Sequence, residues 1–243
     1  MHISLAAEVL GHIWGFPITN TLVTAWIVMG VFIIGALLLR RSLSLVPTGI
    51  QNVMETVFEA GQELVEPLLG KEMAKKAFPL LVTFFLFIVL SNWFGIFPGF
   101  GTIGFYKIHE GEREFLPLLR SVYADLNMTV AIAVISVVMT QVFGFMANGA
   151  GYLKRYFNFS NPVLFFVGLL EIVSEFAKII SFAFRLFGNI FAGEVLLMIV
   201  GFIAPFLAPL PFYGLELFVG LIQAVVFTML TLVFFSMATS SHH

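Results

Sequence analysis

The chain has 243 residues, of which 60% are hydrophobic and 11% are charged. A soluble domain carries about 25% charged residues, so this composition, with a mean hydropathy of +1.02, excludes a water-soluble globular protein. The net charge of −2 leaves no basic surface for nucleic acid, and the absence of cysteine excludes disulfides and thiolate metal sites. The sequence therefore predicts an all-α polytopic membrane protein, because long apolar runs cross bilayers as helices.

The first predicted membrane span covers residues 20–39, the run NTLVTAWIVMGVFIIGALLL. About 20 apolar residues cross the hydrocarbon core of a bilayer, and Arg40 and Arg41 close this run. The segment before it lacks a basic region at its start, so a standard cleaved signal peptide is not expected.

Residues 47–69 show a helical pattern of a different kind. Pro47 suits the start of a helix and Gly70 its end, and apolar residues recur at helical spacing between them. The opposite face is polar and mostly acidic, with Gln51, Glu55, Glu59, Glu63 and Glu66. The pattern predicts one amphipathic helix on the cytoplasmic surface. Packing against a partner protein and an inert surface helix are both left open.

Four further spans are predicted, at residues 77–98, 126–147, 162–203 and 211–238, with residues 205–211 as a tight outer turn. At 1.5 Å per residue the helix over 162–203 would be roughly 60 Å long, twice the hydrocarbon thickness, so it is either steeply tilted or broken. We expect the last two helices to form a long tilted hairpin. No internal repeat or low-complexity stretch occurs, and residues 1–243 are predicted to form a single membrane domain.

The basic residues predict the orientation of the five spans. Seven of the twelve Lys and Arg residues lie in alternate connections, namely Arg40, Arg41, Lys71, Lys75, Lys76, Lys154 and Arg155. The opposite connections hold only Lys107, Arg113 and Arg120, next to acidic residues. The positive-inside rule therefore puts the N-terminus outside and the C-terminus in the cytoplasm.

The two remaining basic residues, Lys178 and Arg185, lie inside the predicted span over 162–203. A charge at this depth costs about 3 kcal/mol on insertion scales. Spacing by sevens places Glu171, Lys178 and Arg185 within about 40° of one another on the helix, and Asn189 joins this face. Such a costly arrangement predicts a function for at least part of this face.

Polar residues lie on both sides of Arg185 along the last two spans. Toward the outer side are Glu194, Glu216 and Gln223, and toward the cytoplasmic side are Glu171 and Glu175. A glutamate in a low-dielectric site can take up and release protons near neutral pH. Arginine cannot relay a proton, but it attracts a carboxylate and forces its ionisation. The pattern indicates two aqueous half-paths for protons, divided by Arg185.

Structural roles are left open for several of these residues. Glu175 and Lys178, three residues apart, could form an ion pair along one helix. Asn189 could make a hydrogen bond between packed helices. Glu194 and Glu216 could instead reach water at the outer interface.

The string RLFGNIFAG, residues 185–193, resembles the signature of subunit a of the F-type ATP synthase, the membrane stator beside the rotating c-ring. SNWFGIFPG, SVYADLNMT and LIQAVVFTMLTLVFFSMA resemble further parts of that family, so the similarity covers essentially the whole chain. The resemblance implies that Arg185 faces the rotor carboxylates. It implies an outer proton path lined by Asn189, Glu194, Glu216 and Gln223, and an inner path near Glu171 and Lys178, where Glu175 also lies.

The resemblance also implies partners and a location. They are the c-ring subunits, the peripheral-stalk b subunits and the lipid bilayer of a bacterial plasma membrane, with a proton or sodium ion as the transported species. No cofactor is expected, and ATP chemistry would belong to partner subunits because the chain has no Gly-rich phosphate loop. Family members often have one glutamate and one histidine at the two outer polar positions, whereas Glu194 and Glu216 are both acidic, so which of them is protonated at rest is left open.

Two other functions compete with this interpretation. One is a stand-alone proton or sodium channel or transporter, which would conduct without a ring of partners. The other is a structural membrane scaffold. Cysteine cross-linking to a ring subunit from Ile179, Leu186 or Ile190, which we expect on the face of Arg185, would distinguish the stator from both.

Overall fold

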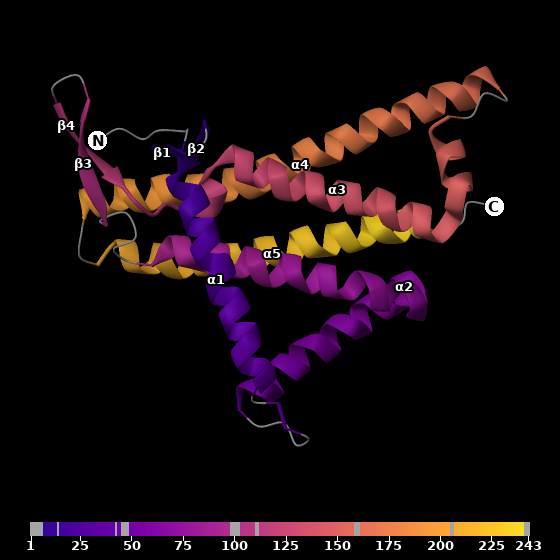
Figure 1. Cartoon of the computed structure of the whole chain (residues 1–243), viewed down its shortest axis with the longest axis horizontal. Coiled ribbons are helices and arrows are strands. Elements are labelled where there is room, and N and C mark those ends of the chain that lie inside the picture. The colour runs from indigo at the N-terminus through magenta and orange to yellow at the C-terminus, as the bar shows by residue number, and fades with distance from the viewer. Residues whose placement is uncertain are drawn as a thin grey trace. The chain divides into compact units, whose positions relative to one another are not determined.

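The computed structural model describes residues 7–13, 15–41, 43–44, 49–97, 103–109, 112–157, 161–204 and 207–240. The chain forms two compact units. Unit 1 consists of Met1–Arg41, Leu86–Thr129 and Phe184–Ala224, and unit 2 of Ser42–Phe85, Val130–Ala183 and Val225–His243. Each unit is built from pieces of several long helices. Figure 1 shows the helices and strands of the chain.

Five helices within the described residues are long and apolar enough to cross a membrane. They are α1 (Asn20–Arg41), α2 (Ile50–Ile96), α3 (Leu126–Asn148), α4 (Pro162–Ile203) and α5 (Pro209–Thr239). The prediction of an all-α polytopic membrane protein with five spans is confirmed. Pro98, at the predicted end of the second span, and Pro205 and Phe206, in the predicted outer turn, lie outside the described residues.

Helix α4 is continuous over its 42 residues. Pro162 occupies its first position, where the missing N–H of proline would have had no helical partner, and no proline or non-helical residue interrupts the rest. A continuous helix of this length is longer than the hydrocarbon thickness. Of the two sequence-based alternatives, a tilted helix and a broken one, the break is therefore excluded.

Unit 1 contains two β-hairpins that the sequence analysis did not predict. Strand β1 (Val9–Ile13) pairs with β2 (Phe16–Thr19), and β3 (Gly104–His109) pairs with β4 (Glu112–Pro117), both antiparallel. The start of α1 holds the second hairpin through the buried Asn20, whose Nδ2 donates to the carbonyl of Pro117 at 3.3 Å.

The connection to α3 is tied to α1 in the same unit. Next to the short 3-10 helix η2 (Val122–Ala124), the buried Thr21 hydroxyl donates to Asp125 Oδ2 at 2.9 Å. These buried hydrogen bonds fix where α1 and α3 begin, because an unmet polar group there would cost about 1–3 kcal/mol.

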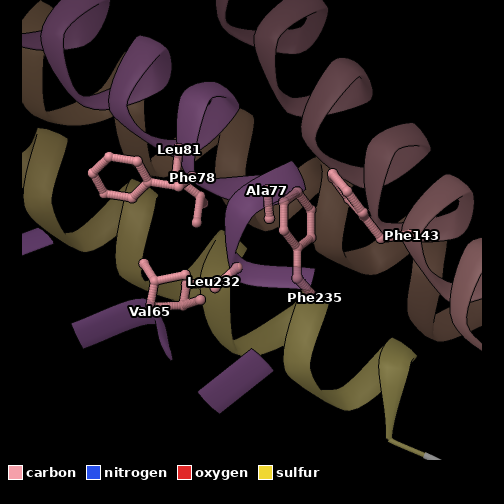
Figure 2. Close-up of a cluster of buried hydrophobic side chains, with 8 residues drawn as sticks. Val65, Ala77, Phe78, Leu81, Phe143, Leu232 and Phe235 are labelled. Carbon is pink, nitrogen blue, oxygen red and sulfur yellow. The ribbon is translucent and has the colours of Figure 1, made fainter. Parts of the chain in front are cut away.

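Unit 2 is held together by a core of buried apolar side chains from α2, α3 and α5 (Figure 2). The rings of Phe143 and Phe235 lie 4.7 Å apart, and Val65, Phe78 and Leu232 are buried around them. Truncating a buried Phe to Ala typically costs about 3–5 kcal/mol. This core joins α2, α3 and α5 within unit 2.

Helix α2 bends at Gly70, whose φ of 73° lies in the left-handed region that favours glycine. The bend ends a first segment, residues 50–69, which is helical over the described part of the range predicted for the surface helix, and its amphipathic character stays a prediction. Val65 of this segment is buried in the unit 2 core, and Ser236 donates to the carbonyl of Leu68 at 3.0 Å. The predicted start at Pro47 lies outside the described residues, and the location of the segment on the cytoplasmic surface stays a prediction.

Candidate functional site

The polar residues predicted on the outer side of Arg185 all lie in unit 1. Asn189 of α4 and Gln223 of α5 contact each other directly: Asn189 Nδ2 donates to Gln223 Oε1 at 2.6 Å. Gln223 is buried, whereas Asn189 is exposed. The hydrogen bond between helices that the sequence analysis left open for Asn189 is therefore present. It links two of the predicted outer-path residues.

Glu194 has a cationic partner that the sequence analysis did not assign to it. Arg120, in the segment before α3, places its Nε 3.6 Å from Glu194 Oε2, and the Arg120 side chain is only 13% exposed. The backbone N–H of Arg120 donates to the buried Thr24 hydroxyl of α1 at 3.3 Å. Arg120 is thus fixed by α1 while its side chain faces a carboxylate of α4.

Glu216 of α5 is buried and lies directly against Gly193 of α4. A Cβ atom at position 193 would overlap the Glu216 carboxylate, so a larger residue there would force this side chain to move. Glu194 is close enough to Glu216 for the two carboxyl groups to interact electrostatically. Two carboxyl groups that interact cannot both be ionised without cost.

Several buried polar atoms of unit 1 have no hydrogen-bond partner within the described residues. They include Asn92 Oδ1, Ser121 Oγ and Gln223 Nε2. The other end of Asn92 is satisfied, since its Nδ2 donates to the carbonyl of Gly220 in α5 at 2.9 Å. Each unmet polar atom costs about 1–3 kcal/mol unless water reaches it. A cluster of them between α2, α5 and the start of α3 favours a hydrated interior.

A buried tyrosine near this cluster stays uncharged. Tyr123 in η2 is almost completely buried, and burial raises its pKa far above the usual value. Its hydroxyl therefore acts as a neutral hydrogen-bonding group rather than as a phenolate.

Arg185 is half-buried and lies beside an exposed stripe of α4. Phe184, Gly188, Ala192 and Leu196 form this stripe, which we call the open stripe of α4. Small residues within it permit close approach of another helix. Leu186 and Ile190, in contrast, are buried. The expectation that they share an open face with Arg185 is wrong, because this side of α4 packs inside unit 1.

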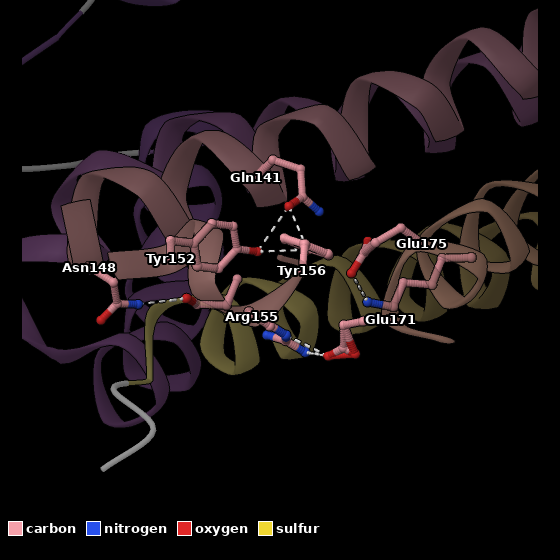
Figure 3. A network of polar contacts seen from close by, with 9 residues as sticks. Gln141, Asn148, Tyr152, Arg155, Tyr156, Glu171 and Glu175 are labelled. Atoms are coloured by element: carbon pink, nitrogen blue, oxygen red, sulfur yellow. Dashed lines mark hydrogen bonds and ion pairs between the residues drawn. The ribbon is translucent and has the colours of Figure 1, made fainter. Parts of the chain in front are cut away.

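The residues predicted on the cytoplasmic side of Arg185 lie in unit 2, and each carboxylate there is paired (Figure 3). Glu171 accepts from Arg155, which belongs to the 3-10 helix η3 (Gly149–Arg155). Glu175 accepts from Lys178 Nζ at 2.7 Å, the ion pair that their spacing predicts. Lys178 also lies 4.6 Å from the ring centroid of Phe234.

The sequence analysis missed the two arginines that pair with Glu194 and Glu171. Arg120 and Arg155 were interpreted only as charges that set the orientation. Glu194 lies far from Arg120 in the sequence, and Glu171 lies on a different element from Arg155. For Arg155, the separation of 16 residues gives no periodic signal. Only the fold brings these pairs together.

The comparisons with known proteins agree with this architecture. The family described as ATP synthase A chain matches residues 22–236. ATP synthase subunit a of Moorella thermoacetica is 33% identical over 234 residues, which cover 95% of this chain and 95% of the relative. The protein of the same name from Gloeobacter violaceus is 34% identical, covering 92% of this chain and 85% of the relative.

A third relative comes from a chloroplast. The chloroplastic ATP synthase subunit a of Oedogonium cardiacum is 35% identical over 224 residues, which cover 92% of this chain and 84% of the relative. Similarity of this extent, over five apolar helices and the string RLFGNIFAG, confirms the resemblance stated from the sequence. The chain belongs to the ATP synthase A chain family, the family of ATP synthase subunit a.

Proposed function

We propose that this chain conducts protons through two offset half-channels beside a ring of rotor subunits, and that Arg185 separates the two. As a member of its family, the chain is the proton-translocating stator subunit of an F-type ATP synthase, a multi-pass membrane protein that works with other subunits of that complex. The observation that carries the proposal is the position of Arg185, half-buried beside the open stripe of α4.

Arg185 supplies the charge that a rotor carboxylic acid meets. Its guanidinium stays protonated, so it cannot pass a proton on, but it stabilises an ionised carboxylate in a low-dielectric site. An approaching acid therefore releases its proton, and protons cannot cross directly from one half-channel to the other. Gly188 and Ala192 in the open stripe leave room for the rotor helix that carries this acid.

The outer half-channel would use the polar residues of unit 1. Glu216 and Glu194 would exchange protons with outside water, and the Asn189–Gln223 hydrogen bond would lie between them and the rotor. The unmet polar atoms of Asn92 and Gln223 support water in this region. Because the two glutamates interact, a proton shared by them is available to move.

The inner half-channel would use Glu171, Glu175 and Lys178 of unit 2. Their ion pairs balance the charges, which lowers the cost of keeping them inside the membrane. We further propose that the partners are the c-ring and the peripheral-stalk b subunits. The membrane would be a bacterial plasma membrane with the N-terminus outside, as the distribution of basic residues favours.

Cross-linking tests whether the open stripe faces the rotor. The chain has no native cysteine, so Gly188→Cys or Ala192→Cys can be combined with single cysteines on a ring subunit in the assembled complex. We expect disulfide formation from both positions and none from the buried control Ile190→Cys. Equal cross-linking from Ile190→Cys, or none from the stripe, would contradict the stator arrangement.

A second test separates the stator from a stand-alone channel. The purified chain reconstituted alone into liposomes should conduct few protons, because its half-channels are offset and need a rotor to join them. Rapid acidification of the liposomes by the chain alone would favour the channel.

A further inference from the structure

Unit 2 contains a cavity of about 630 Å³ whose wall is partly polar and partly apolar. Its lining includes Asn148, Tyr152, Lys154, Arg155, Val167 and Glu171, from the end of α3, η3 and the first third of α4. Lys154 and Arg155 are among the basic residues that the positive-inside rule assigns to the cytoplasmic side. The cavity therefore lies on the side of the protein where protons would leave.

The Arg155–Glu171 ion pair forms part of this wall (Figure 3). Two guanidinium nitrogens, Nε and one Nη, approach the same oxygen, Glu171 Oε1. The side chains are 19% and 25% exposed, so the pair is largely shielded but can be reached from the cavity. Arg155 is the basic residue of η3 that fixes where the Glu171 carboxylate lies.

A cluster of hydroxyl and amide groups continues from the cavity wall. Tyr152 and Tyr156 both donate to Gln141 Oε1, at 3.0 and 2.8 Å, and their own oxygens are 3.3 Å apart (Figure 3). Burial and the nearby Glu175 carboxylate raise the pKa of Tyr156, so it stays a neutral donor.

Two buried atoms next to this cluster have no partner within the described residues. Gln141 Nε2 can donate and Glu175 Oε2 can accept. A donor and an acceptor left unmet in one region favour water between the polar groups, since each costs about 1–3 kcal/mol if it stays dry. Ionisable and hydroxyl groups thus continue from the cavity toward Glu175.

We propose that Arg155 is a positioning residue of the inner proton path, which holds the Glu171 carboxylate at the wall of a water-filled cavity open to the cytoplasm. This inference rests on the proposed function of the chain. A proton that reaches Glu171 breaks its O–H bond there and forms one with a water molecule in the cavity. Arg155 takes no proton itself, because a guanidinium is always protonated at physiological pH.

Thiol labelling tests whether the cavity holds water. In the assembled complex, Val167→Cys should react with a membrane-impermeant, charged thiol reagent at least about tenfold faster than Phe166→Cys, because a thiol reacts as the thiolate and ionises in water. Phe166 is the matched control, since it is 59% exposed but does not line the cavity. It is also one residue nearer the cytoplasmic start of α4, so depth alone would make it react faster.

Equal or slower reaction of Val167→Cys would overturn the proposal, because lipid rather than water would then fill the cavity. The readout does not require rotation. The labelling result is therefore independent of the cross-linking from Gly188 and Ala192, which tests the proposed function itself.

A double-mutant cycle tests the role of Arg155. We expect Arg155→Gln and Glu171→Gln each to slow ATP-driven proton transport by at least about tenfold, and Arg155→Lys to retain most of it. The double variant Arg155→Gln/Glu171→Gln should be as slow as Glu171→Gln alone. A purely structural ion pair predicts the opposite, since removing both partners of a buried pair is often neutral. Transport near the wild-type rate in the double variant, or in Glu171→Gln alone, would overturn the proposal.

Discussion

The carboxylates in the polar clusters of the two units differ in their ion pairing. In unit 2, Glu171 and Glu175 each have a cation of their own, Arg155 and Lys178. In unit 1, Glu194 has Arg120 at the longer distance of 3.6 Å, and Glu216 has no ion-pair partner among the described residues. The comparison indicates that the charges of unit 2 are balanced within the unit, whereas Glu216 of unit 1 is left for a transported proton to neutralise.

Breaking one ion pair of unit 2 should have the largest effect on stability. Lys178→Gln leaves Glu175 as an uncompensated charge with a 13% exposed side chain, and the cost should be about 3–5 kcal/mol. The double variant Glu175→Gln/Lys178→Gln should recover most of this loss. Thermal unfolding of the purified chain in detergent measures both. If the double variant were as unstable as Lys178→Gln alone, the ion pair would not account for the effect.

Removing the carboxylates of unit 1 should affect transport rather than folding. The double variant Glu194→Gln/Glu216→Gln should reduce ATP-driven proton transport by roughly 100-fold, because the two acids proposed to exchange protons on the outer side are removed. Amides fill the same space, and the Arg120–Glu194 contact is long at 3.6 Å, so the unfolding temperature should fall less than in Lys178→Gln. Proton transport into membrane vesicles is the measurement, and a rate close to the wild-type value would remove these residues from the outer path.

Removing the hydrogen bond between Asn189 and Gln223 should have a smaller effect on transport in unit 1. Asn189→Ala leaves Gln223 Oε1 without its donor, at a cost of about 1–3 kcal/mol, and transport should slow by about fivefold. Ile222→Val, next to Gln223 on α5 and 44% exposed, serves as the control because it lies outside the open stripe and its aliphatic side chain makes no hydrogen bond. Unchanged transport in Asn189→Ala would make the bond a packing feature only.

A hydroxyl pair in unit 2 should give the smallest effect. Ser136 and Thr231 are hydrogen-bonded at 2.9 Å between α3 and α5. Ser136→Ala should destabilise the protein by about 1 kcal/mol without slowing proton transport beyond that loss. A transport defect larger than the stability change would mean that unit 2 loads protons through hydroxyl groups as well.

The helices could be predicted from the sequence because their signals are local. Pro162 and the uninterrupted apolar run after it give the bounds of α4, and the three-residue spacing gives the ion pair of Glu175 and Lys178. The family could be predicted from the string around Arg185.

The remaining features depend on contacts between distant segments. Arg120 and Glu194 are brought together only when α1, through Thr24, fixes the segment before α3. The spacing of residues on a helix likewise does not reveal which side packs, so Leu186 and Ile190 were placed on the wrong face. The two hairpins escaped prediction because the segments that form them are short and of mixed composition.

The central claim is that the Arg185 guanidinium separates two proton paths that only a moving rotor connects. The most direct measurement is proton flux through membrane vesicles carrying the assembled complex with Arg185→Ala. We predict that ATP-driven transport falls by at least about 100-fold while passive proton leakage increases, because no fixed cation then divides the paths. Retained ATP-driven transport in this variant would contradict the account.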